Sequence, residues 1–463
     1  MAHPLRYRVL PVLLALAAVC LSGCATVVIG RPGAQGPAPR AGESDVTVTG
    51  ASGDAVDKLA TDALADLQDY WSAAFPDVFG RPFQPLQGGY FSVDPDNIDL
   101  AQYPQGVGCG SDPREAENNA FYCQSPNAPN SDSITYDRSF LGELGRQYGA
   151  FLPALVMAHE FGHAVQARVV SPSASIAVET QADCYAGSWT RWVADGKAAR
   201  SRLREPQLDG LLRGYFLLRD PVGTSTAEQS AHGSYFDRVS AFQDGFDGGP
   251  EACRDDFGPD RVFTQGSFGD RDEALTGGNA PYEDLLRIVE SSLPTVWAQA
   301  FGDIFHEPFT APEIRPFDRT APRCSPDADL DLVYCADDRL VAFDQTDLAQ
   351  PAYQDIGDFA VATAIAIPYA QGVRDQLGLS TENKEAVRSA VCLTGWYAGK
   401  VFNRQAGPNI RISPGDLDES IQFLLTYGDS PTVLPAADLT GFELVDLFRN
   451  GFETGLSACG LKT

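Results

Sequence analysis

The sequence has few basic residues, and this shortage restricts what the protein can bind. Its 463 residues include 34 Lys and Arg against 62 Asp and Glu, which gives a formal net charge of −28. A chain this acidic has no basic surface to neutralise phosphates, so nucleic acid is a poor candidate partner. Gly and Pro are also too few for a low-complexity chain, at 44 and 32 residues. The chain is therefore globular, and its length allows two or three domains.

The sequence also lacks a long hydrophobic run near its start. The apolar run at residues 9–21 is shorter than the roughly 20 residues that span a bilayer. It follows two arginines and ends in Leu21-Ser22-Gly23-Cys24, which is similar to a bacterial lipobox. We expect residues 1–23 to be a signal peptide and Cys24 to be acylated, by palmitate for example, on the extracytoplasmic face of the cell membrane. The alternative is an ordinary secretory signal that ends near a cysteine.

The segment after Cys24 and the remaining cysteines fit an extracytoplasmic protein. Residues 24–49 contain Pro and Gly without apolar periodicity and predict a flexible tether. Thiols oxidise outside the cytoplasm, so the eight cysteines beyond the tether predict four disulfides. Their number alone permits many pairings.

An internal duplication selects one pairing. Residues 71–85 (WSAAFPDVFGRPFQP) match residues 297–311 (WAQAFGDIFHEPFTA), and residues 236–246 (FDRVSAFQDGF) match residues 442–452 (FELVDLFRNGF). Each half then carries the same four cysteines. The predicted disulfides are Cys109 with Cys123, Cys184 with Cys253, Cys324 with Cys335, and Cys392 with Cys459. We expect a tandem duplication of one domain, with the copies at residues 50–258 and 283–463.

A metal-binding pattern lies in the first half. The apolar stretch at residues 154–169 has helical character and contains His159, Glu160 and His163 in the order HExxH. Residues four apart share one helix face, so both imidazoles can bind one metal ion while Glu160 reaches the water on that ion. The alternative is a pair of histidines without a metal.

A third ligand is expected from a second helix, because catalytic zinc usually has three protein ligands and one open position. Glu179 and Asp183 follow sixteen and twenty residues after His163 and again share a helix face. Glu179 would complete a His, His, Glu set for one zinc ion per chain. Asp183 would accept a hydrogen bond from the ring nitrogen of a ligand histidine that does not face the metal. Alone, such a pair would be interpreted as a solvated acidic face.

These motifs resemble a known family. The strings HEFGHAVQ at residues 159–166 and ETQADCYAG at 179–187, with FYC at 121–123 and AHG at 231–233, are similar to the bacterial putative neutral zinc metallopeptidase family, in particular its lipoprotein peptidase branch. The resemblance implies a gluzincin-like, zincin-type fold with Glu as the third zinc ligand and peptides as substrates. It does not supply a particular substrate.

The second copy lacks the chemistry of the first. At an offset of 208 residues, the five positions of the metal motif fall on apolar residues, proline or glutamine. The replacements are Ile367, Pro368, Gln371, Val387 and Val391. His232 and Arg238 are also replaced, by Asp438 and Leu444. We therefore expect residues 283–463 to be a degenerate pseudo-peptidase repeat.

The remaining candidates concern catalysis and substrate binding. Glu160 is the expected general base, and His232 is the candidate donor to the oxyanion, with Tyr235 and Arg238 behind it. His232 could equally cap a helix or orient a ligand. The segment at residues 132–137 (DSITYD) predicts either an edge strand that pairs with substrate or an ordinary core strand.

The sequence as a whole predicts a mainly helical α+β domain that occurs in two copies. Helices are expected near residues 55–75, 141–169, 179–195, 205–218 and 234–247, with strands near 88–92 and 120–136. The predicted function is a lipid-anchored, extracytoplasmic zinc endopeptidase. The alternative is a non-catalytic binding or regulatory lipoprotein that uses the degenerate repeat as its interaction surface.

Overall fold

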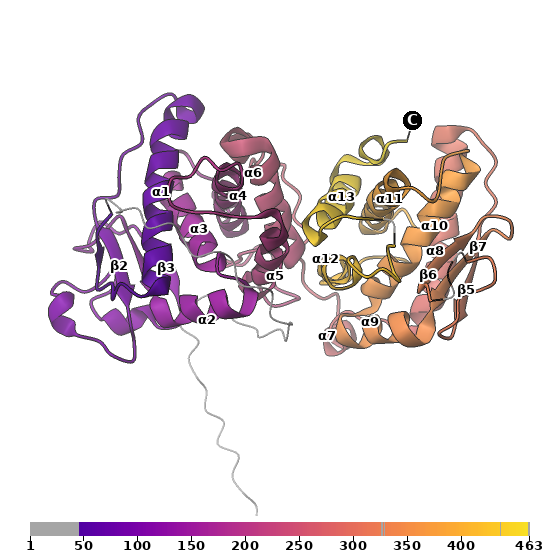
Figure 1. The fold of residues 1–463 in the computed structure, drawn as a ribbon, viewed down its shortest axis with the longest axis horizontal. Helices are drawn as coiled ribbons and strands as arrows, with labels where there is room; N and C mark the ends of the chain where they lie inside the picture. Colours follow the sequence, from indigo (N-terminus) through magenta and orange to yellow (C-terminus); the bar gives the residue numbers. More distant parts are fainter. Residues whose placement is uncertain (1–45, 326, 328, 436, 462–463) are drawn as a thin grey trace, which may run out of the picture.

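The computed structural model describes residues 46–461 except residues 326, 328 and 436. The predicted signal peptide, the lipid anchor Cys24 and nearly all of the tether lie outside the described residues. Two helical bodies lie side by side, one from each half of the chain, each with a small sheet on its outer side (Figure 1). Within the described residues, no helix is both long and apolar enough to cross a membrane.

The first body contains four strands and six α-helices. The strands are β1 (Val48–Thr49), β2 (Gly89–Val93), β3 (Ala120–Cys123) and β4 (Ser133–Asp137). The helices are α1 (Ala55–Phe79), α2 (Arg138–Tyr148), α3 (Leu152–Gln166), α4 (Ser175–Ala194), α5 (Leu208–Leu218) and α6 (Tyr235–Asp255). Short 3-10 turns are η1 (Leu100–Gln102), η2 (Pro113–Ala116) and η3 (Glu205–Gln207).

The second body follows a short connecting helix. The connector holds α7 (Arg271–Thr276), and the strands of the second body are β5 (Glu313–Phe317), β6 (Leu332–Cys335) and β7 (Leu340–Asp344). The helices are α8 (Tyr282–Ala300), α9 (Gln350–Asp355), α10 (Asp358–Gln376), α11 (Lys384–Phe402), α12 (Asp416–Tyr427) and α13 (Gly441–Thr454). The π turns η4 (Phe301–Phe305) and η5 (Gln345–Ala349) and the 3-10 turn η6 (Leu456–Cys459) complete it.

The predicted mainly helical α+β class is confirmed, and most expected helices are present. The long helix expected at residues 141–169 is in fact two helices, α2 and α3, separated by Gly149, whose φ of 119° leaves the helical region. The short strands expected near residues 120–136 are β3 and β4, which pair in an antiparallel manner.

The sheets of the two bodies have related orders. The first sheet runs β1-β2-β4-β3, with β2 parallel and β3 antiparallel to β4. The second runs β5-β7-β6, with β5 parallel and β6 antiparallel to β7. The segment at residues 132–137 lies mostly in β4, a buried inner strand, so the core-strand alternative is correct for it. The edge strands of the first sheet are β1 and β3.

Three helices of the first body pack closely because glycines face the contacts. A Cβ atom at Gly162 of α3 would lie 2.9 Å from Ala182 Cα in α4. A Cβ at Gly245 of α6 would lie only 1.8 Å from the Cys184 carbonyl oxygen in α4. Any larger residue would therefore force these helices apart. The close approach brings the HExxH motif on α3 against residues 179–183 on α4.

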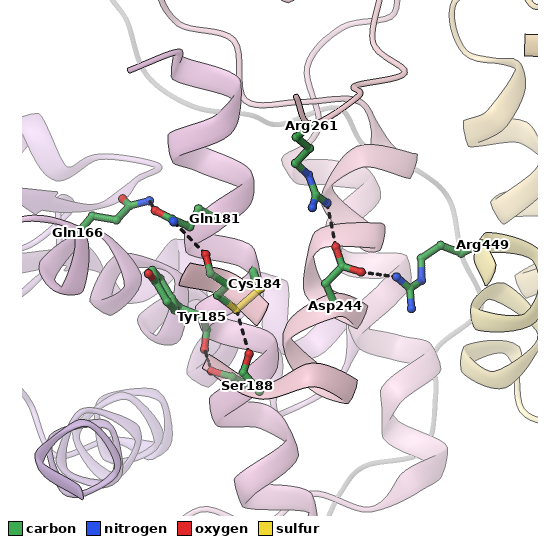
Figure 2. Close-up of a disulfide and its surroundings, with 10 residues drawn as sticks. Gln166, Gln181, Cys184, Tyr185, Ser188, Asp244, Arg261 and Arg449 are labelled. Carbon is green, nitrogen blue, oxygen red and sulfur yellow. Dashed lines mark hydrogen bonds and ion pairs between the residues drawn. A yellow bond between two sulfur atoms is a disulfide. The ribbon is translucent and has the colours of Figure 1, made fainter. Parts of the chain in front are cut away.

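Disulfides join the same elements that the glycines bring together. Cys184 of α4, labelled in Figure 2, bonds to Cys253 of α6, and Cys392 of α11 bonds to Cys459 in η6 after α13. The other two disulfides are Cys109–Cys123 and Cys324–Cys335. All four predicted pairs are present, and each lies within one half of the chain.

The two bodies meet through α5 and α6 on one side and α12 and α13 on the other. Aromatic rings interleave there, with Phe236 and Phe452 centroids 4.9 Å apart. The Arg449 guanidinium reaches across to Asp244, which also pairs with Arg261 (Figure 2). The carboxylate of Asp209 accepts hydrogen bonds from the first backbone N–H groups of α13. These contacts hold the two bodies together.

Candidate active site

His159, His163 and Glu179 converge at the contact between α3 and α4. His159 Nε2 lies 3.3 Å and His163 Nε2 lies 3.6 Å from Glu179 Oε2. The two imidazole rings are perpendicular, with centroids 4.8 Å apart. Two ligand atoms bound about 2.05 Å from a tetrahedral ion are about 3.3 Å apart. The spacing of the three side chains therefore fits a tetrahedral zinc ion with one further position open.

Asp183 holds His159 from the side away from the cluster. His159 Nδ1 lies 2.7 Å from Asp183 Oδ1. The Arg238 guanidinium donates to both oxygens of Asp183, from Nε at 2.7 Å and from Nη2 at 2.9 Å. A proton on Nδ1 leaves the lone pair of Nε2 directed at the cluster, which is what a metal ligand needs. Asp183 thus occupies the position predicted for it.

Gln166 holds His163 in the same way, although Gln166 was not predicted as a site residue. Its Oε1 lies 2.8 Å from His163 Nδ1, while its Nε2 donates to the Val178 carbonyl and to Gln181 Oε1. Gln181 in turn donates to the Cys253 carbonyl, so the disulfide region supports this arrangement (Figure 2). The spacing could have predicted this contact, because Gln166 follows His163 by three residues and shares its helix face.

Glu160 is on α3, and its side chain points toward the edge strand β3. Its side chain is buried, and its Oε2 accepts a hydrogen bond of 2.7 Å from the Tyr122 backbone N–H. That N–H points away from β4, along the open edge of the sheet. The carboxylate is therefore located where an extended chain could pair with β3.

The charges around the cluster favour a cation at its centre. Burial lowers the pKa of His159, but Asp183 and the other nearby carboxylates raise it to about 10. Burial raises the pKa of Glu179, and the two histidines then bring it well below its usual range. Burial also raises the pKa of Glu160, which suits a general base working near neutral pH.

His232 lies close to the N-terminal part of α4, which carries Glu179. Its neighbour Gly233 faces Thr180, since a Cβ at Gly233 would lie 3.2 Å from Thr180 Cγ2, one residue from Glu179. His232 Nδ1 lies 3.0 Å from Asp220 Oδ1, and the backbone N–H groups of His232 and Gly233 donate to Asp220 Oδ2. Asp220 was not predicted. It fixes the ring of His232 and leaves Nε2 for another partner.

Two other candidates lie deeper than expected. Tyr235 is buried in the core, where its hydroxyl donates to the Leu212 carbonyl. Arg238 is buried against Asp183. The structure therefore brings Arg238 to the metal cluster through Asp183, whereas it gives the Tyr235 hydroxyl a core partner.

The aligned positions of the second body have no such cluster. Ile367, Val387 and Val391 are buried apolar side chains on α10 and α11. Among the described residues, the other group of carboxylates or histidines with metal-ligand spacing is Asp358, Asp416 and Glu419, which lies elsewhere in the second body.

Comparison with known sequences agrees with the geometry of the site. Residues 7–257, more than half of the chain, match the family described as "Putative neutral zinc metallopeptidase". The chain belongs to this family. The match covers the first body together with residues before it and ends before the second body begins. All three residues of the His, His, Glu cluster lie inside it.

Curated relatives of this chain occur in Mycobacterium tuberculosis and Escherichia coli. The chain is 28% identical over 199 residues to "Uncharacterized protein Rv2575" of Mycobacterium tuberculosis, a match that covers 37% of this chain and 64% of the relative. It is 26% identical over 225 residues to "Uncharacterized protein YpfJ" of Escherichia coli K12, covering 43% of this chain and 71% of the relative. The chain thus spans just under two thirds of the length of the mycobacterial relative. No solved structure matches it.

Proposed function

We propose that the first body is a zinc-dependent endopeptidase with its active site between α3, α4 and β3. The convergence of His159, His163 and Glu179, with Glu160 beside them and outside the ligand set, supports this proposal most directly. A structural zinc site would need no such additional carboxylate. Zinc held there supplies a Lewis acid and lowers the pKa of a bound water.

The chain's own residues would perform the proton transfers. Glu160 accepts a proton from the attacking water and returns it to the leaving amine, because its carboxylate adjoins both the metal ligands and the open strand edge. His232 donates from Nε2 to the oxyanion, with Asp220 holding the ring by Nδ1. Arg238 keeps Asp183 ionised and in place behind His159.

The open edge of β3 is the proposed site for the peptide chain. An extended segment that adds to β3 would run past Glu160, which already accepts from the Tyr122 N–H, and would bond to other backbone groups on this edge, independently of side-chain identity. This mode of binding suits unfolded or extended protein segments. The four disulfides are typical of an oxidising compartment, and we propose that Cys24 anchors the enzyme on the extracytoplasmic face of the membrane, as in the lipoprotein branch of the family.

We also propose that the second body is a duplicated copy of the first that has lost its catalytic residues. The related sheet orders, the matching disulfides and a second pair of contact glycines support this proposal. Gly451 approaches the Cys392 carbonyl oxygen in the second body as Gly245 approaches that of Cys184 in the first.

The experiment compares wild type with Glu160→Gln in the soluble protein from about residue 46 onward. Zinc content is measured for both, together with cleavage of a denatured, fluorescently labelled protein. We expect one zinc per chain in each and a rate for Glu160→Gln lower by about 10²- to 10⁴-fold, because only the general base is removed. A wild type without stoichiometric zinc, or a variant that cleaves as fast as wild type, would contradict the proposal and favour a binding function.

A further inference from the structure

A second group of carboxylates is buried in the second body. Asp358 lies in the first turn of α10, and Asp416 and Glu419 lie in the first turn of α12. One oxygen of each lies within 4.8 Å of the corresponding oxygens of the other two. The three residues are only 8%, 5% and 7% exposed. Three carboxylates this close and this buried need a compensating charge or bound protons.

The hydrogen bonds around this group leave one oxygen without a partner. Asp358 Oδ2 accepts from the Ala280 N–H, Asp416 Oδ2 from the Ser413 N–H, and Glu419 Oε2 from the Phe359 N–H, each at 2.8 Å. Asp358 Oδ1 is buried and has no hydrogen-bond partner among the described residues. A buried carboxylate oxygen without a hydrogen-bond partner destabilises the folded protein unless a ligand binds to that oxygen.

The described side chains supply no compensating cation. None of the ion pairs in the described part of the chain includes Asp358, Asp416 or Glu419, and the neighbouring Asp418 is already paired with Arg219. Glu273 adds a further negative charge close to Asp416. Burial raises the pKa of Asp358 to about 6, and burial together with Asp358 raises those of Asp416 and Glu419 well above their usual range.

We propose that Asp358, Asp416 and Glu419 bind a calcium ion. The ligand atoms are all carboxylate oxygens, which hard divalent cations prefer to transition metals. The three oxygens lie within 4.8 Å of one another, which is close enough for one ion to contact all three. Magnesium usually keeps several of its waters and is bound through one or two carboxylates, so a buried set of three protein carboxylates suits calcium.

The ion would fix the start of the second body to its core. Asn279 and Ala280, at the end of the connector, bond to the backbone N–H and the carboxylate of Asp358, and Tyr353 donates to the Ala280 carbonyl. A cation between α10 and α12 would thus hold the connector and both helix starts in one arrangement. The site would be structural, because its ligands leave no general base beside it.

The corresponding positions of the first body are apolar. At the offset of 208 residues, Asp358, Asp416 and Glu419 fall on Ala150, Leu208 and Leu211. The calcium site is therefore a feature of the second body alone, and its residues are separate from those proposed to bind zinc. Failure of one site does not imply failure of the other.

The test titrates CaCl2 into the soluble protein at pH 7.5 after removal of divalent ions and reloading with one equivalent of zinc. Calorimetry measures binding, and thermal unfolding is followed with and without CaCl2. We expect one calcium per chain with a Kd of about 10⁻⁴ M or tighter, and a rise in Tm with CaCl2. The double variant Asp416→Asn with Glu419→Gln should bind calcium at least about 10-fold more weakly and lose that rise, since two of its charged ligands are neutral.

The matched control is Glu290→Gln with Glu382→Gln, which removes two exposed charges and should bind calcium as wild type does. Both double variants should fold, because the site variant removes repulsion between buried carboxylates and the control variant changes only exposed side chains. If Asp416→Asn with Glu419→Gln did not fold, Glu419→Gln alone would replace it. Absence of calcium binding by wild type, binding of MgCl2 in preference to CaCl2, or retained calcium affinity in the site variant would each overturn the proposal.

Discussion

The two bodies differ most where α3 and α4 meet in the first and α10 and α11 meet in the second. In the first body this contact holds His159, His163 and Glu179, whereas in the second it holds buried apolar residues such as Ile367 and Val387. The disulfide and the glycine contact behind it are the same in both. The comparison separates what the helices need in order to pack from what the chemistry needs.

In the part of the chain that the structure describes, the second body also has a buried charged cluster that the first body lacks. The second body has buried carboxylates at the starts of α10 and α12, where the first has alanine and leucine. Each body therefore has one cluster of potential metal ligands among its described residues, and the two clusters lie at different places. We infer that the shared scaffold tolerates a charged site at either end of its central helices.

Removal of the matching disulfides tests this separation most strongly. Cys184→Ala with Cys253→Ala opens a link between residues 69 apart, and Cys392→Ala with Cys459→Ala opens one between residues 67 apart. Each pair should lower the free energy of unfolding by about 4 kcal/mol, because the loops are of similar length. Denaturant unfolding under non-reducing conditions measures both.

The two disulfide variants should differ in activity. Loss of the first bond frees α4 from α6, and with it the support of Gln181 and Gln166 behind His163. Zinc affinity and peptidase activity should then fall, while the variant of the second bond keeps both as long as it stays folded. Equal loss of activity in the two folded variants would show that the second body takes part in catalysis.

Variants of His232 and Asp220 test whether the first body contains an oxyanion donor. His232→Ala should lower kcat by about 10²-fold with little change in KM, because the hydrogen bond is stronger in the transition state. Asp220→Asn should have a smaller effect in the same direction, since it only loosens the ring of His232. Steady-state kinetics at equal zinc content measure both. A change in KM alone would assign His232 to substrate binding.

The smallest expected effect concerns the contact between the bodies. Burial and the neighbouring Asp446 raise the pKa of Asp247 to about 6 beside Arg449. Because this value lies above that of the unfolded chain, the carboxyl group favours folding below about pH 4, and this contribution is lost as the pH rises through 6. Asp247→Asn should therefore stabilise the protein at pH 7.5 and not at pH 4.

The gain should be below about 1 kcal/mol, since the side chain of Asp247 is 46% exposed and solvent screens its charge. Thermal unfolding at the two pH values measures it. A stabilisation that is the same at both pH values would mean that ionisation of Asp247 is not its cause.

The residues of the zinc cluster could be predicted from sequence because helical spacing fixes which side chains share a face. His159 and His163 are four residues apart on α3, and Glu179 and Asp183 are four apart on α4. The pairing of the cysteines could be predicted because the halves match. Gly149 was a weaker signal, and the break that it makes between α2 and α3 was missed.

Contacts between distant segments could not be predicted in the same way. Asp220 and His232 are twelve residues apart in a loop without periodicity, and only the folded chain brings them together. The carboxylates of α10 and α12 are separated by 58 residues or more in sequence and meet through packing. The order of strands in the first sheet, which places β3 at an edge, likewise depends on pairing between strands rather than on any one segment.

The proposed zinc site is tested most directly by the zinc content of three proteins purified in parallel. Wild type, Glu179→Gln and the second-body control Glu382→Gln are dialysed against the same low zinc concentration and analysed by elemental mass spectrometry. We expect one zinc per chain in wild type and in Glu382→Gln, and much less in Glu179→Gln, because Glu179 Oε2 faces both histidines. Two zinc ions per wild-type chain, or full zinc retention in Glu179→Gln, would contradict the proposed site.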